Sequence, residues 1–138
     1  MSPYLQRAAK AAVVTICATL AGWKLFEGLY VWADHAAAAE EAADHNAWFA
    51  GSTQHVAAYI VGVLFVPLAT WTGLHLTRIR GNHLTILASG LAWIILSAPH
   101  LVDCNPDIIT VVAWTALQTA LTAAAAAATS PPRVKASR

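Results

Sequence analysis

Charged residues are scarce in this sequence. Asp, Glu, Lys and Arg make up only 11% of its 138 residues, whereas they make up about 25% of an average soluble domain. A formal net charge of +1 gives no support to nucleic-acid binding. Cysteine is limited to Cys17 and Cys104, which we expect at different depths of the structure, so an internal disulfide is excluded. The sequence contains no motif typical of a catalytic site or a redox pair.

Apolar residues dominate what remains. They make up 58% of the sequence and give it a mean hydropathy of +0.55. Because a helix needs about 20 apolar residues to cross a bilayer, the chain has room for four such helices and little else. We predict an all-α membrane protein, a four-transmembrane-helix bundle that forms one integral membrane domain over residues 1–138. The expected spans are approximately residues 9–33, 54–76, 84–101 and 107–129.

The charges are sorted along the chain. All basic residues except Lys24 lie near the N-terminus, in the turn 77–83, or in a tail over residues 130–138. All acidic residues except Glu27 lie in the two other connections. Since positively charged loops stay in the cytoplasm, we predict a multi-pass protein of the cytoplasmic membrane with both termini and the basic tail cytoplasmic. A signal peptide cleaved near Ala21 is an alternative that would leave three spans in the same orientation.

Local signals predict where two of the helices begin and bend. Ser52 is the expected N-cap of the second span, and Pro67 is expected to kink that span. Gly62 is expected to allow close contact with a neighbouring helix. Residues 105–107, which are Asn, Pro and Asp, supply an N-cap, a proline at the first helical position and a first-turn carboxylate for the last span.

Two ionisable residues interrupt the first apolar run. Lys24 and Glu27 are three residues apart, so they share one face of a helix. Ionisable side chains at this depth of a membrane are costly, normally face the protein interior and mark functional sites by default. The alternative is a structural ion pair that fixes how the helices pack, or a lysine that reaches to the membrane surface.

The segment that follows the first apolar run is acidic. Residues 34–52 are rich in alanine, glutamate and aspartate, which predicts an outer helical loop that extends the first helix beyond the bilayer. Glu41 and His45 are four residues apart and could hold a metal ion from one helix face. The alternative is a solvated acidic surface without a ligand.

Several polar residues are expected in the outer half of the bundle, where they form a candidate ligand pocket. His55 and His100 fall at the outer ends of antiparallel neighbours and could jointly bind a haem iron, another metal or a quinone oxygen. Hydrated histidines at the membrane surface are the alternative. The candidate pocket residues are Lys24, Glu27, His55, Tyr59, His100 and Asp103, with Gln118 near the middle.

Short motifs in the first three spans resemble a known family. They are Gln54-His55 at a helix start, the basic turn 77–83, Leu91-Ala92-Trp93, and the Pro-His-Leu-Val sequence of residues 99–102. Together they resemble the small four-helix DoxX-like membrane proteins of high-GC actinobacteria. The resemblance implies the same four-helix architecture. Some members of that group are linked to membrane redox complexes.

These features lead to three functional hypotheses. The first is a non-catalytic accessory subunit of a larger membrane complex, or a binder of a small apolar ligand. The second is a membrane redox, metal-binding or haem-binding protein that uses His55 and His100. The third is a self-assembling, holin-like pore. The expected partners are the lipid bilayer and either a larger membrane complex or further copies of the chain, and the sequence does not identify a cofactor.

Overall fold

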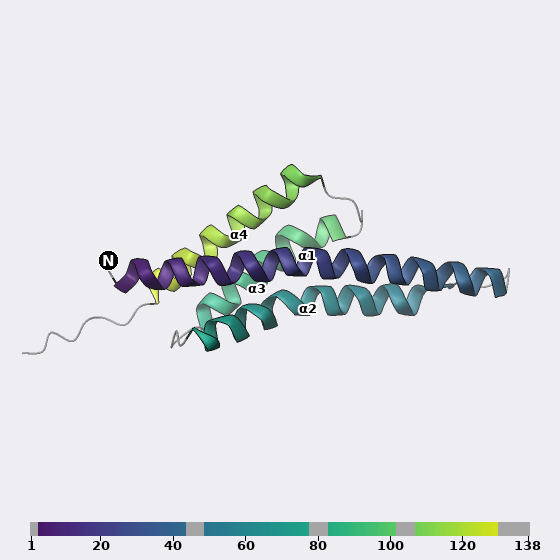
Figure 1. Ribbon diagram of the computed structural model, residues 1–138, viewed down its shortest axis with the longest axis horizontal. Coiled ribbons are helices and arrows are strands. Elements are labelled where there is room, and N and C mark those ends of the chain that lie inside the picture. The colour runs from purple at the N-terminus through teal and green to yellow at the C-terminus, as the bar shows by residue number, and fades with distance from the viewer. Residues whose placement is uncertain (1–2, 44–48, 78–82, 102–106, 130–138) are drawn as a thin grey trace, which may run out of the picture.

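The computed structural model is all-helical, as predicted, and describes residues 3–43, 49–77, 83–101 and 107–129 (Figure 1). Three of its helices, α1, α2 and α4, are long and apolar enough to cross a membrane. In α3 the described apolar stretch is shorter, His83–Ile95. The helices are α1 (Pro3–Ala43), α2 (Ser52–Leu76), α3 (His83–Leu101) and α4 (Ile108–Ala128).

The first helix is much longer than a bilayer is thick. Its 41 residues correspond to about 61 Å at 1.5 Å per residue, whereas the hydrocarbon core is about 30 Å thick. The acidic segment is part of this helix, which ends at Ala43, as the composition of the segment predicted. Figure 1 shows α1 and α2 side by side, both reaching beyond α3 and α4 at one end. We call the projecting residues 34–43 and 49–55 the outer extension.

The start of α2 differs from the prediction by one residue. Its N-cap is Gly51, with φ 70° and ψ 0°, and Ser52 is the first helical residue. The prediction of Ser52 as N-cap is therefore wrong. Gly51 packs directly against Ala37 of α1, so this turn needs a residue without a side chain that also adopts the left-handed conformation. Glycine meets both needs.

The start of α4 also differs in detail. Asp107 is the N-cap, and its Oδ1 accepts a hydrogen bond of 2.6 Å from the backbone N–H of Thr110. The carboxylate thus caps the helix directly, which satisfies one of its free N–H groups, rather than sitting in its first turn. The other two residues of the predicted signal, Asn105 and Pro106, lie outside the described residues.

Aromatic residues from α1 and α3 form the centre of the bundle. Trp23, Phe26 and Trp93 are buried together with Val66 of α2. The rings of Trp23 and Trp93 meet edge to face, with centroids 5.4 Å apart and planes at 77°. The indole N–H of Trp93 donates a hydrogen bond of 3.2 Å to the carbonyl of Gly62, so one side chain joins α3 to both α1 and α2.

Small polar side chains fill much of the remaining interior. The hydroxyls of Thr70 and Ser89 lie 3.3 Å apart, which joins α2 to α3. The hydroxyl oxygens of Thr15, Thr19 and Thr85 are buried without a hydrogen-bond partner among the described residues. Their contribution is therefore their small size, which lets helix backbones approach, as in many membrane bundles.

The exposed face of α4 is more apolar than the face through which it packs. The buried residues of α4 are Thr115, Gln118, Thr122 and Ala126, whereas its exposed side chains include Ile108, Ile109, Val112, Leu117 and Leu121. A helix that packs through polar residues and exposes large aliphatic ones is the reverse of the pattern in soluble proteins. The pattern fits a bundle surrounded by lipid.

Candidate functional site

The described members of the candidate pocket lie in separate parts of the molecule. Lys24 and Glu27 are exposed on α1, and Tyr59 is exposed on α2. His100 belongs to the last turn of α3, and its side chain is not among those described. Asp103 lies outside the described residues. The sequence grouped these residues by depth alone, whereas in the structure Lys24, Glu27 and Tyr59 are exposed and Gln118 is buried.

Among the pocket candidates whose side chains are described, Gln118 is the one that lies in the interior. Its side chain is 1% exposed, and its amide nitrogen donates to the backbone carbonyl of Ser89 at 3.3 Å. Within α4, the backbone carbonyl of Gln118 accepts a hydrogen bond of 2.8 Å from the hydroxyl of Thr122. Gln118 therefore holds α4 against α3.

The predicted metal sites find no support in the described residues. Within them, no three His, Cys, Asp or Glu side chains come together in a way that could hold a metal ion. Glu41 is exposed near the end of α1, and its predicted partner His45 lies outside the described residues. Both ring nitrogens of His55 are engaged, Nδ1 with the Gly51 carbonyl at 2.8 Å and Nε2 with Asp34 Oδ1 at 2.9 Å.

His55 instead belongs to a set of polar contacts that closes the outer extension. Its ring also meets Tyr30 edge to face at 5.2 Å. Beside it, the Glu40 carboxylate accepts hydrogen bonds from the Gly51 backbone N–H at 2.8 Å and from the Gln54 amide at 2.7 Å. Sequence reasoning identified Gln54-His55 as a helix start but missed its partners. The sequence did contain a signal for these partners. In an antiparallel helical hairpin, residues at similar distances before and after the turn lie opposite each other, so the acidic residues before the turn could be expected to face Gln54 and His55.

These contacts shift two pKa values in opposite directions. Hydrogen bonds from Gly51 and Gln54 to the carboxylate lower the pKa of Glu40 below its ordinary 4.5. His55 precedes the apolar run of α2. Two hydrogen bonds raise the pKa of its imidazole above 6.5. The bond to the Gly51 carbonyl has the larger effect, and the bond to Asp34 has the second largest. Glu40 therefore stabilises the extension when ionised, and His55 when protonated.

The stability of the outer extension should consequently be greatest between about pH 4.5 and 6.5. The Glu40 contribution is lost as the pH falls through its lowered pKa, and the His55 contribution is lost as the pH rises through its raised pKa. We expect amide hydrogen exchange of residues 34–43, corrected for its intrinsic pH dependence, to accelerate from pH 5.5 to 8.5. Asp34→Asn should reduce this alkaline effect. A corrected rate in the wild type that is constant over that range would contradict the role of His55.

The ion pair expected from the sequence is present, but on the outside of the bundle. Lys24 Nζ lies 2.7 Å from Glu27 Oε2, and the two side chains are 82% and 61% exposed. Thr15 and Ala33, both 0% exposed, are each nine residues from Lys24 and so are turned about 180° from it on the helix. Lys24 therefore points away from the face through which α1 packs. The pair cannot fix contacts between α1 and the other helices.

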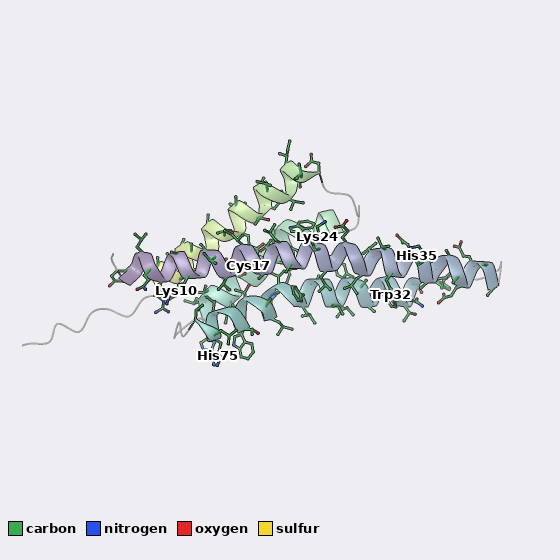
Figure 2. The ribbon with its side chains drawn as sticks, in the orientation of Figure 1. Lys10, Cys17, Lys24, Trp32, His35 and His75 are labelled. Atoms are coloured by element: carbon green, nitrogen blue, oxygen red, sulfur yellow. The ribbon has the colours of Figure 1, made fainter. Side chains whose placement is uncertain are left out.

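This outward position is unusual for the middle of an apolar segment. At a rise of 1.5 Å per residue, Lys24 is about 15 Å from Asp34 and about 21 Å from Lys10 along α1. Figure 2 shows Lys24 between Lys10 and His35 on this helix. A charged side chain at the centre of a bilayer costs about 2.5–3.5 kcal/mol by insertion measurements. Pairing within one helix offsets only part of that cost, because both groups still lose their water.

A shallow apolar hollow is present between α3 and α4. Its volume is about 280 Å³, and it is lined by Ala88, Leu91, Ala92, Ile95 and Leu121. The lining lacks a polar group that could orient a ligand, a feature of specific binding sites. On the outside of a membrane bundle such a hollow would face lipid chains, so it does not by itself indicate a dedicated ligand.

Comparison of the chain with protein-family models, with curated proteins and with solved structures finds no match. The resemblance to DoxX-like proteins therefore rests on the sequence motifs alone. Taken together, the described residues present one chemically unusual surface, the outward face of α1 around Lys24 and Glu27.

Proposed function

We propose that this protein is a small multi-pass protein of the cytoplasmic membrane that acts as a non-catalytic subunit by binding another protein inside the bilayer. The observation that carries the proposal is the Lys24–Glu27 pair, exposed on the outward face of α1 in the middle of an apolar segment. Ionisable side chains within a spanning helix normally face protein or water rather than lipid. A protein partner that covers this face would remove the pair from lipid.

Membrane insertion, on which this proposal depends, is supported by two observations. Three helices have the length and composition to cross a bilayer, and α4 packs through Thr and Gln residues while exposing Ile, Val and Leu. The basic residues at both ends of the chain and in the turn 77–83 favour cytoplasmic termini.

The two alternative functions have less support. A haem or metal centre at His55 and His100 would require a free ring nitrogen on His55, but Gly51 and Asp34 engage both nitrogens. A pore formed by self-assembly requires a polar surface that lines a water-filled path, and the exposed residues of α4 are largely aliphatic.

Photo-crosslinking in native membranes tests the proposal. A photoreactive amino acid in place of Val31, which is 52% exposed beside the ion pair on α1, should form a discrete adduct with a protein. The same amino acid in place of Leu68, 58% exposed on α2, serves as the matched control and should react mainly with lipid. Failure of position 31 to form any protein adduct, or equal adducts at both positions, would refute a docking role for α1.

A further inference from the structure

We propose that the partner on the outward face of α1 is a second copy of this chain, so that two Lys24–Glu27 pairs combine into one ring of four charges. This inference rests on the proposed function and names its partner. The contact surface is a line of exposed residues that we call the α1 seam. The α1 seam consists of Cys17, Ala21, Lys24, Gly28 and Val31.

The spacing of the α1 seam suits a pair of parallel helices. Its members follow one another at intervals of four, three, four and three residues. This is the heptad spacing with which two helices keep one line of contact while winding around each other. The helix continues well past the line at both ends, from Pro3 to Ala43, so a partner helix could lie along its full membrane segment.

Small residues on both sides of Lys24 would let two helices come close. Ala21 and Gly28 stand one turn before and one turn after it, and both are exposed. A methyl group added at Gly28 would meet no atom within 4 Å, unlike one at Gly62 in the interior. The space above Gly28 is therefore open and can be filled by the backbone of a neighbouring helix, as small residues permit in membrane dimers.

Lys24 on the α1 seam and Glu27 beside it complement the same two residues of a second copy. Lys24 and Glu27 differ in height along the helix by about 4.5 Å. In a dimer whose two-fold axis runs parallel to the helices, equivalent residues stand at equal height. The flexible lysine of each copy can then bind its own Glu27 and also Glu27 of the second copy. The ring contains two positive and two negative groups, so it is neutral and needs no further charged residue.

A second copy fits this surface better than an unrelated protein for that reason. An unrelated partner could cover the pair, but it would extend the pair into a larger ring only by supplying an acid and a base of its own at matching heights within the membrane. A second copy supplies both automatically, through the same two residues. It also brings the exposed thiol of Cys17, one heptad below Lys24, close to the thiol of its counterpart.

The thiol allows the dimer to be detected in membranes. Two differently tagged full-length chains, both with Cys104→Ser, are expressed together, and their membranes are oxidised with copper phenanthroline. We expect a disulfide-linked dimer that contains both tags. With Glu27→Lys in both chains, four lysines would meet, and the yield should fall about tenfold or more. Lys24→Glu in one chain and Glu27→Lys in the other should restore the dimer between the two tags only.

Two further variants make the result decisive. Lys24→Glu with Glu27→Lys in the same chain preserves an ion pair on each helix and should dimerise like the wild type, which separates loss of pairing from loss of insertion. Leu68→Cys with Cys17→Ser and Cys104→Ser moves the thiol to α2 and should give no dimer. A dimer yield unaffected by Glu27→Lys would overturn the inference. Crosslinking of α1 only to a different protein would overturn it while leaving the proposed function in place, and absence of any protein adduct would overturn both.

Discussion

Replacing Trp93 by Ala is expected to lower the free energy of unfolding by about 3–5 kcal/mol, the range found for loss of a large buried aromatic side chain. Trp93 is 0% exposed, so the substitution leaves a cavity in the centre of the bundle. It also removes the edge-to-face contact with Trp23 and the hydrogen bond to the Gly62 carbonyl. That carbonyl belongs to α2, so α3 would lose its central attachment to both neighbouring helices.

Pulsed proteolysis across a titration of mild detergent with SDS measures this change. Trp71→Ala is the matched control, because Trp71 is 53% exposed and stacks only on His75 of its own helix within the described contacts. The control should change the free energy of unfolding by no more than about 0.5 kcal/mol. Equal effects of the two substitutions would mean that the interior packing around Trp93 does not determine stability.

The helices themselves were largely predictable from the sequence. Apolar runs of sufficient length and their polar separators place all four helices close to their observed positions, because a helix that could cross a bilayer needs about 20 apolar residues in succession. The extension of α1 to Ala43 followed from its alanine and glutamate content. The errors occur at the helix starts. Gly51 replaces Ser52 as N-cap because the fold requires a close approach to Ala37, which capping preferences do not consider.

The arrangement of the candidate site was predictable only in part. The spacing of Lys24 and Glu27 correctly predicted an ion pair, but the general rule that ionisable residues face the interior of a bundle placed it on the wrong side. The sequence does not say which face of α1 packs against its neighbours, because apolar residues occur all around that helix. The contact between Asp34 and His55 spans 21 residues and depends on how α1 and α2 align.

A second large effect is expected at Gly62, where α2 lies close to Phe26 of α1. A side chain added at Gly62 would collide with the ring of Phe26. That ring is 4% exposed and packs on Tyr30 at a centroid distance of 4.9 Å, so it has little space to move aside. Gly62→Val should therefore push the two helices apart and cost about 1–3 kcal/mol of unfolding free energy. The same detergent titration measures it, and proteolysis between α1 and α2 should accelerate.

Gly28→Val is the matched control for this prediction, and it also separates the fold from the dimer. Position 28 has no atom within 4 Å of an added methyl group, so the substitution should change the unfolding free energy of one chain by no more than about 0.5 kcal/mol. The same valine lies on the α1 seam, where its extra bulk would keep two helices apart and reduce crosslinking through Cys17. Gly62→Val should destabilise the chain even when it is monomeric, whereas Gly28→Val should weaken only the association of two chains. If both valines destabilised the monomer equally, the outward orientation of Gly28, and with it the α1 seam, would be wrong.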